Sequence, residues 1–310
     1  MPNSKITLGT VQLGMNYGIT NQEGQPSRPE ASAILKEAFR LGIRSLDTAN
    51  AYGVAEEIIG ETLQSTPNLQ IEVVTKLSPL SQLTPRSSVS EVIAAVESSL
   101  RASRESLRTA TLGTVLLHEP RHFTDYDGLI WKHLKKQVDE GYIQKIGLSL
   151  YSPDQLITLR DPYVQAVQIP FNLLDWRWRS PQALEMLTQR QNTTVYVRSI
   201  LLQGILGSSP SLWPNLEGVD APSIVQRMEN WVTRLNRKNR TDLCFNYVRS
   251  KPWVSQIILG VASLGQLQEN WNLLQSTQPL TATETQQIEN DFLDIPERLL
   301  NPGLWFEDPS

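Results

Sequence analysis

The first half of the chain contains an acid, a phenol, an amine and an imidazole that could act together: Asp47, Tyr52, Lys76 and His118. A free phenol has a pKa of about 10 and is a poor proton donor or acceptor near neutrality. An ammonium beside a phenol stabilises the phenolate, and a carboxylate beside the ammonium keeps the amine charged and in place. An imidazole can orient a substrate oxygen by hydrogen bonding. Such a set can polarise a carbonyl, but it supplies no hydride, so a redox reaction needs a bound cofactor.

Three of these residues end successive β-rich segments of the sequence. Asp47, Lys76 and His118 are the last residues of these segments, and Tyr52 follows in the loop after Asp47. Side chains alternate between the two faces of a strand, and neighbouring parallel strands of a barrel end at the same rim. We therefore expect the four side chains to meet in one pocket.

The whole chain alternates β-rich and helical segments. The β-rich segments are Ile6–Thr10, Ile43–Asp47, Ile71–Lys76, Thr114–His118, Lys145–Ser149, Val164–Gln168, Thr194–Arg198 and Gln256–Gly260. Helical spacing is found at about 30–41, 55–65, 88–104, 127–140, 153–160, 180–190, 223–250 and 264–274. Eight repeats of strand and helix predict an α/β fold, a closed (β/α)8 barrel with parallel strands.

We expect a single domain over residues 1–310, because no composition break or low-complexity linker divides the chain. The barrel spans about 6–274, and a tail over 275–310 carries one helix at 282–293. The segment 199–222, rich in Gly and Pro, is a long loop after the seventh strand. Loops that follow barrel strands lie at the rim where active sites are built.

Composition excludes several classes of protein. Of 310 residues, 40% are hydrophobic and 19% charged, which is enough to bury a large core. The formal net charge of −4 gives no basic excess for nucleic acid or an anionic membrane. The single cysteine, Cys244, offers no internal disulfide and no thiolate set for a metal, so we expect no metal site. His122 and His133 are predicted at the surface. No signal peptide or membrane span is seen, and we expect a cytoplasmic protein.

The ordered motifs resemble those of the aldo-keto reductase superfamily. The run Asp47-Thr48-Ala49-Asn50-Ala51-Tyr52-Gly53 is similar to the superfamily signature, and Val74-Thr75-Lys76 and Leu116-Leu117-His118-Glu119-Pro120 resemble its next two motifs. Further matching segments are Leu8–Gly14, Gly147–Ser149, Gln168–Asn172 and Gly260–Asn270. The resemblance covers about residues 6–274, and the ordered set is far more specific than any one motif.

The resemblance implies a barrel that binds NADPH without a Rossmann fold and reduces a carbonyl substrate. In that case Tyr52 supplies the proton, Lys76 and Asp47 adjust the acidity of the Tyr52 hydroxyl, and His118 orients the carbonyl. The positions that match the family's nucleotide-binding residues are Thr10, Val11, Asp47, Ser149, Gln168, Arg198, Ser199, Leu201, Gly204, Gly260, Gln266, Glu269 and Asn270. Of these, Ser149 and Gln168 match the carboxamide contacts, Ser199, Leu201 and Gly204 the pyrophosphate loop, and Gln266, Glu269 and Asn270 the adenosine end.

The sequence departs from the family pattern at the cofactor positions. Leu150 stands where a polar residue is frequent, and Arg198 replaces an aromatic residue that stacks on the nicotinamide. A planar guanidinium can stack in the same way. Ala262 stands where a serine is usual, and no Lys or Arg occurs between Gly260 and Gln275 to bind a 2′-phosphate. We expect NADPH, with NADH left open.

Two other functions remain open from the sequence. One is a nucleotide-binding redox sensor or partner-docking module with little turnover, and the other is a Schiff-base aldolase that uses Lys76. The primary hypothesis is reduction of an aldehyde, ketone or sugar, or the reverse oxidation. The sequence leaves the substrate, the direction and the oligomeric state undetermined, because variable rim loops set specificity.

Aromatic residues in the rim loops extend this hypothesis. Tyr17, Asn50 and Tyr151 follow the first, second and fifth strands, and topology alone places them at the pocket. We interpret Trp176 and Trp178 as packing residues, since arginine beside tryptophan readily stacks without a ligand.

Overall fold

The computed structural model describes residues 5–189 and 192–306. The strands form one closed barrel in the order β1 to β8, and every neighbouring pair is parallel. The strands are β1 (Ile6–Gly9), β2 (Ser45–Asp47), β3 (Glu72–Leu77), β4 (Leu112–Leu117), β5 (Ile143–Ser149), β6 (Val164–Pro170), β7 (Thr194–Arg198) and β8 (Gln256–Gly260). The predicted (β/α)8 barrel is therefore confirmed.

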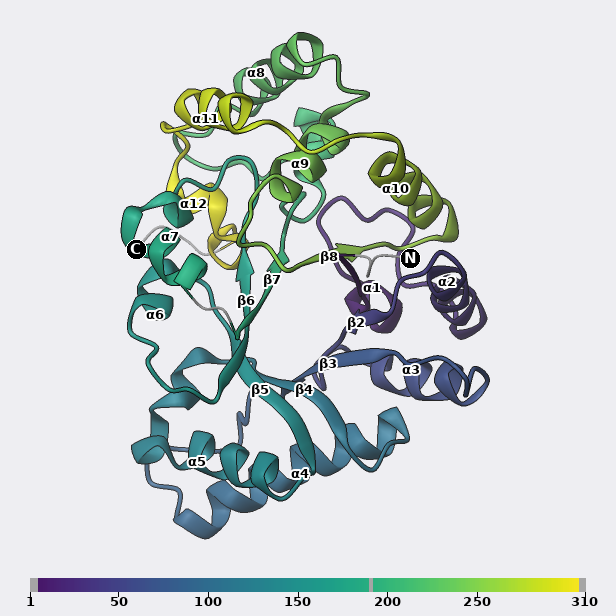
Figure 1. Cartoon of the computed structure of the whole chain (residues 1–310), viewed down its shortest axis with the longest axis vertical. Coiled ribbons are helices and arrows are strands. Elements are labelled where there is room, and N and C mark those ends of the chain that lie inside the picture. Colours follow the sequence, from purple (N-terminus) through teal and green to yellow (C-terminus); the bar gives the residue numbers. More distant parts are fainter. Residues whose placement is uncertain (1–4, 190–191, 307–310) are drawn as a thin grey trace.

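Helices surround the strands (Figure 1). Those of the repeat are α2 (Arg28–Arg40), α3 (Ala55–Gln64), α4 (Val89–Leu107), α5 (Asp125–Asp139), α6 (Pro153–Ile157), α7 (Pro181–Gln189), α8 (Ala221–Arg234), α9 (Arg240–Arg249) and α10 (Leu264–Ser276). Additional short elements are α1 (Val11–Gly14), α11 (Ala282–Asp291), α12 (Glu297–Leu300) and the 3-10 turns η1 (Pro120–Phe123), η2 (Arg177–Arg179), η3 (Ile205–Gly207), η4 (Pro210–Leu212) and η5 (Pro302–Leu304).

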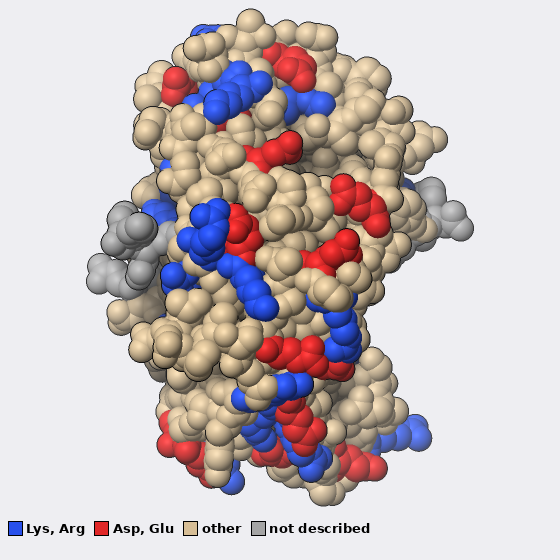
Figure 2. Space-filling model, turned by 90° about the vertical axis from the view of Figure 1, so that its right-hand side faces the viewer, with Lys and Arg blue, Asp and Glu red and all other residues tan. Residues whose placement is uncertain are grey.

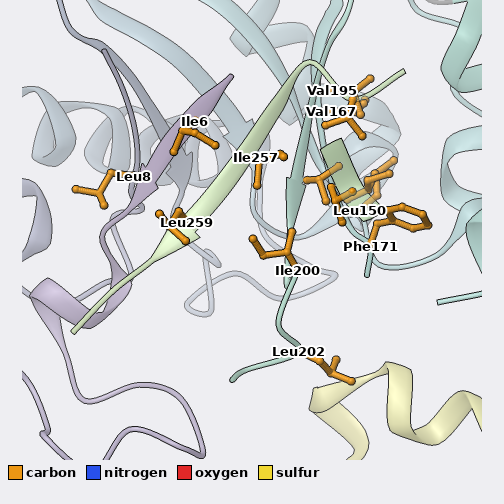
Figure 3. Close-up of a cluster of buried hydrophobic side chains, with 14 of the residues drawn as sticks. Ile6, Leu8, Leu150, Val167, Phe171, Val195, Ile200, Leu202, Ile257 and Leu259 are labelled. Atoms are coloured by element: carbon orange, nitrogen blue, oxygen red, sulfur yellow. The ribbon is translucent and has the colours of Figure 1, made fainter. Parts of the chain in front are cut away.

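Alternation along the strands divides the core into two layers. Inside the barrel, one cluster contains Val74, Leu116, Ala166, Tyr196 and Ile258. The residues between them point outward into a larger cluster shared with the helices. Figure 3 shows this outer layer, with Ile257 and Leu259 of β8 beside Ile6 and Leu8 of β1. Each such aliphatic side chain contributes about 1.5–3 kcal/mol when fully buried.

Polar side chains close the barrel at the amino ends of the strands. Glu72 accepts hydrogen bonds from the Tyr196 hydroxyl at 3.2 Å and the Thr114 hydroxyl at 3.5 Å. The Lys145 ammonium lies 3.5 Å from the same carboxylate oxygen. Every second side chain of a strand points to the same face. The residues two positions after the inner cluster therefore also point into the barrel, nearer its opposite, carboxyl-end rim.

The segment 223–250 is two helices, so the single predicted helix is wrong there. Helix α8 ends at Arg234, and α9 begins at Arg240 after Asn239, whose side chain accepts a hydrogen bond from the Asp242 amide. Between them, Asn236 has a left-handed backbone with φ of 50°. Asparagine tolerates this conformation, which ends a helix at little cost. The apolar spacing continues across the break and hides it from a periodicity argument.

The tail after α10 packs on the segment that follows β6. The indole of Trp176 donates to the Ile295 carbonyl at 2.8 Å, and Arg177 donates to the Leu300 carbonyl at 3.2 Å. Trp178 is fully buried. The packing interpretation of both tryptophans is confirmed. In Figure 1, α11 also lies beside α8, where Trp231 donates to Asp291.

Charges of both signs intermingle on the face shown in Figure 2, without a large patch of either sign. Over residues 5–189 and 192–306, no helix combines the length and the apolar character that a membrane crossing requires. The same described residues contain no cluster of three His, Cys, Asp or Glu side chains suited to a metal ion.

Candidate active site

The inner side of the carboxyl rim carries the predicted chemical residues. Lys76 lies two positions after the inner residue Val74 on β3, and His118 follows Leu116 in the same way just beyond β4. Gln168 and Arg198 stand in the same relation to Ala166 and Tyr196. The strand period thus turns all these side chains toward one space.

Asp47 and Lys76 form a buried ion pair at this rim. The Lys76 Nζ lies 2.8 Å from Asp47 Oδ1 and donates to the Thr48 carbonyl at 2.8 Å. The Lys76 side chain is 1% exposed and the Asp47 side chain 6%, so both charges are shielded from bulk water. Gln168 Nε2 also donates to Asp47 Oδ1, at 2.6 Å. Burial alone disfavours the ammonium, but the attraction of Asp47 and Tyr52 outweighs it and raises the pKa of Lys76.

Tyr52 is held against this pair by a close approach of two backbone segments. A Cβ on Gly14 would lie 1.9 Å from the Tyr52 carbonyl, so only glycine lets α1 pack on the loop after β2. The Lys76 Nζ lies 4.7 Å from the centroid of the Tyr52 ring. The nearby Tyr52 side chain also contributes to the raised pKa of Lys76. The phenol therefore sits next to a permanent positive charge.

His118 lies next to Tyr52 as a neutral imidazole. The two rings make an edge contact with centroids 6.0 Å apart and an interplanar angle of 87°. Burial, followed by the cations Lys76 and Arg198, lowers the pKa of His118 to about 4. Its Nδ1 atom is buried and has no hydrogen-bond partner in the described chain. A neutral imidazole has one donor and one acceptor nitrogen, which suits it to hold a carbonyl oxygen.

A cavity of about 760 Å³ opens over this group at the carboxyl rim. Of the predicted residues, its walls contain Val11, Asp47, Tyr52, His118, Ser149, Gln168, Arg198, Ser199, Leu201, Gly204, Gly260, Gln266 and Asn270. Lys76 and Thr10 lie buried behind the wall, where the Thr10 hydroxyl donates to the Asp47 carbonyl at 2.9 Å. Glu269 is exposed on α10 and does not line the cavity. Ser149 Oγ and Gln168 Oε1 face each other at 3.5 Å.

Two of the three residues placed at the pocket by topology do line it. Tyr17 and Tyr151 are part of the wall. Asn50 is not; it lies near the buried carboxyl of Glu56, whose pKa it helps to lower against the effect of burial. The surface prediction for His122 is wrong, because its side chain is 2% exposed beneath the rim. Cavity lining depends on side-chain direction, which loop position alone does not give.

The sequence reasoning missed most of the loop that follows β1. This loop contributes Gly18, Thr20, Asn21, Gln22 and Glu23 to the wall. It contacts the loop after β7, where the Thr20 hydroxyl donates to the Gln203 carbonyl at 3.1 Å. Gly204 has φ of 94°, and a Cβ there would lie 2.0 Å from Thr20 Oγ1. The rule that loops after barrel strands form the site could have identified the segment, but not the individual side chains.

The wall presents buried polar atoms that a nicotinamide dinucleotide can pair with. Gln12 also lines the cavity, and its Oε1 is buried without a hydrogen-bond partner in the described chain. This orphaned acceptor and the His118 Nδ1 require polar partners, which a ligand can supply. Gly260 is packed so closely on the Gln12 amide that a Cβ would lie 2.9 Å from it. The far end is formed by Gln266 and Asn270 on α10, whose first turn is capped by Ser263.

Comparison with known proteins agrees with this architecture. The sequence profile of the Aldo/keto reductase family matches residues 5–290. An uncharacterised oxidoreductase of Mycobacterium tuberculosis is 30% identical over 239 residues, 73% of this chain and 67% of that protein. The aldo-keto reductase YhdN of Bacillus subtilis is 24% identical over 288 residues, 86% of this chain and 83% of that protein. In fold, the holo form of an aldo-keto reductase from Bacillus halodurans superposes with a TM-score of 0.70 at 21% identity, covering 98% of this chain and 94% of that one.

Proposed function

This chain belongs to the Aldo/keto reductase family of oxidoreductases, and we propose that it reduces the carbonyl group of a small aldehyde, ketone or sugar with a nicotinamide cofactor. The observation that carries the proposal is the buried ammonium of Lys76, paired with Asp47 and in contact with Tyr52 at the wall of the cavity. The same residues serve the reverse oxidation of an alcohol.

When bound, the nicotinamide supplies or accepts the hydride. Tyr52 acts as the general acid and transfers its hydroxyl proton to the carbonyl oxygen, which becomes the alcohol oxygen. Lys76 stabilises the resulting phenolate by its charge, and Asp47 keeps the ammonium charged and fixed. His118 donates its ring N–H to the carbonyl oxygen and so aligns the substrate.

The residues proposed to hold the nucleotide follow the cavity from its centre outward. Ser149 and Gln168 hold the carboxamide, Arg198 stacks on the nicotinamide ring, and Thr10 and Val11 lie near the ribose. The loop with Ser199, Leu201 and Gly204 takes the pyrophosphate, and Gly260, Gln266 and Asn270 form the adenosine end. Glu269 precedes Asn270 on α10 but lies outside the cavity wall, so it is assigned no contact. NADPH is the expected form, with NADH left open, and a cytoplasmic location remains a prediction.

The contacts of Lys76 disfavour the aldolase alternative. A Schiff base requires a neutral amine as the nucleophile. The Lys76 Nζ instead donates to Asp47 and Thr48, and its pKa is raised. Lys76 therefore remains an ammonium across the physiological pH range.

Purified protein titrated with NADPH and NADH, and then assayed with a panel of aldehydes, ketones and sugars, tests the proposal. We expect quenching of tryptophan fluorescence on nucleotide binding and loss of nucleotide absorbance with at least one carbonyl. Nucleotide binding with no turnover across the panel would instead favour a redox sensor or docking module. Failure to bind either nucleotide would contradict both.

A further inference from the structure

Arg198 places a positive charge at the centre of the cavity wall. It ends β7, two residues beyond the inner side chain of Tyr196, and it is half-buried. Among the described wall residues, Arg198 is the only Lys or Arg. Lys76 lies behind the wall, and its charge is neutralised by Asp47.

The contacts of Arg198 leave much of its hydrogen-bonding capacity unused. Its Nη2 donates to the Leu150 carbonyl at 3.2 Å, and its Nη1 donates to Ser199 Oγ at 3.5 Å. A guanidinium has five N–H donors, so three remain. No carboxylate forms an ion pair with Arg198 within residues 5–189 and 192–306. Most other arginines that line buried sites in proteins have such a partner, because an unpaired charge is costly to desolvate.

Two tyrosines frame the guanidinium. Its carbon lies over the Tyr151 ring, 5.0 Å from the ring centroid, in a cation–π contact. Tyr17 also lines the cavity, and Arg198 lies within electrostatic reach of both phenols. Their pKa values are raised by burial, and Arg198 is the strongest opposing influence in each case. Both hydroxyls are therefore protonated at neutral pH and can donate hydrogen bonds.

The same guanidinium lies near the reacting centre. After burial and Lys76, it is the next cause of the low pKa of His118. The acidic residues of the described wall do not neutralise the charge of Arg198. Asp47 is engaged by Lys76 and Gln168, and Glu23 is exposed on the loop after β1. Glu119, outside the wall, contributes to the raised pKa of Tyr151 but forms no ion pair with Arg198 in the described part of the chain. The cavity thus carries one uncompensated cation next to the residues proposed to bind the carbonyl.

We propose that Arg198 binds an anionic group of the substrate, so that the preferred substrates are carbonyl compounds that carry a carboxylate or a phosphate. This inference rests on the proposed reductase function and names its substrate class. Bidentate hydrogen bonds from the guanidinium recognise the anion, and the hydroxyls of Tyr17 and Tyr151, which line the same cavity, can assist.

Matched substrates that differ only in charge test the proposal. Succinic semialdehyde is compared with its methyl ester for the carboxylate, and glyceraldehyde 3-phosphate with glyceraldehyde for the phosphate. The wild-type protein is expected to favour at least one anionic member by tenfold or more in kcat/KM. A charged hydrogen bond contributes about 1.5–3 kcal/mol, so Arg198→Met should lower that preference by about 10- to 100-fold. Because Arg198 is also proposed to contact the nicotinamide, turnover of both members of a pair is expected to fall in Arg198→Met, and the ratio of charged to neutral kcat/KM is the readout. Arg198→Lys should restore part of the preference.

Arg234→Met is the matched control. This arginine also lies over an aromatic ring, with its carbon 4.7 Å from the centroid of Trp231, but it is exposed on α8 and does not line the cavity. It should leave the preference unchanged. Absence of any preference in the wild type would overturn the proposal. So would an equal loss for charged and neutral substrates in Arg198→Met, or a weaker nucleotide Kd with the preference intact, which would assign Arg198 to the cofactor alone.

Calorimetry separates this proposal from the proposed reductase function. Succinate and inorganic phosphate are titrated into the complex of the protein with NADP⁺, without any turnover. Binding that Arg198→Met abolishes would support the anion site even if no carbonyl were reduced, in which case the reductase function alone would fail. No binding of either anion, together with turnover of neutral carbonyls only, would overturn the anion site and leave the reductase function standing.

Discussion

At the scale of single residues, His118 shows how the pocket sets a protonation state. Its pKa of about 4 results from burial and from the cations Lys76 and Arg198. The unfolded chain has an ordinary histidine pKa of about 6.5 and takes up the proton first as the pH falls. The resulting contribution to stability is therefore complete above pH 6.5 and decreases as the pH falls toward 4.

We predict that the His118 ring in the native protein is neutral at pH 6 and titrates near 4. Proton–nitrogen NMR of protein with labelled histidine measures this directly, and the spectrum of a His118→Asn variant assigns the signal. His122, whose pKa is also about 4 because of burial and Arg121, provides an internal comparison. A midpoint near 6.5 for His118 would show that the pocket does not exclude the charged imidazole.

The reacting residues could be identified from the sequence because the strand period fixes their direction. Lys76, His118 and Gln168 follow inner core residues by two positions, so strand ends alone bring them together. Tyr52 lies in a loop, and its place depends on the close contact between Gly14 and the Tyr52 carbonyl. No periodicity expresses such a contact. The loop position after Asp47 indicated that Tyr52 lies at the rim, and the resemblance to a family motif supported it. The part of the wall contributed by Gly18, Thr20, Asn21, Gln22 and Glu23 after β1 was missed for the same reason.

At the scale of elements, the packing of α1 on the loop after β2 determines where Tyr52 stands. We predict that Gly14→Ala lowers kcat by at least about tenfold, because its Cβ would displace the Tyr52 backbone, and an error near 1 Å at a reacting group can cost about 100-fold. The free energy of unfolding should fall by about 1–3 kcal/mol, as is typical of overpacking. Steady-state kinetics and urea unfolding measure the two effects.

Gly303→Ala serves as the control, since the nearest atom to its Cβ would be Asn301 Oδ1 at an ordinary 3.4 Å. It should leave kcat unchanged. If Gly14→Ala retained full activity, the account of how Tyr52 is positioned would be wrong.

At the scale of the whole molecule, a buried ion pair in the segment after β6 holds the arginine that hydrogen-bonds the tail. Arg177 Nη2 lies 2.8 Å from Asp175 Oδ2, with the side chains 7% and 0% exposed, and Arg177 also donates to the Leu300 carbonyl. Arg177→Met leaves the Asp175 carboxyl buried without its partner. We predict a loss of about 3–5 kcal/mol in the free energy of unfolding, and faster hydrogen exchange in α11 and α12.

The double variant Asp175→Asn/Arg177→Met should recover part of that stability, because it also removes the buried charge. Unchanged exchange in α11 and α12 would show that the tail is held by its apolar contacts alone. The prediction that residues 1–310 form one domain is examined in the same experiments, since one domain should unfold in a single transition. The sequence indicated the tail helix at 282–293 but not α12, whose single turn is too short for a periodic pattern.

The measurement that tests the proposed chemistry most directly is the turnover of Tyr52→Phe with the best carbonyl of the panel. Removing one hydroxyl leaves the ring contacts with Lys76 and His118 in place, so the fold and the nucleotide Kd should be unchanged within about twofold. We predict that kcat falls by at least about 100-fold, as expected for loss of a general acid. Turnover equal to that of the wild-type protein would contradict the assignment of Tyr52 as the proton donor.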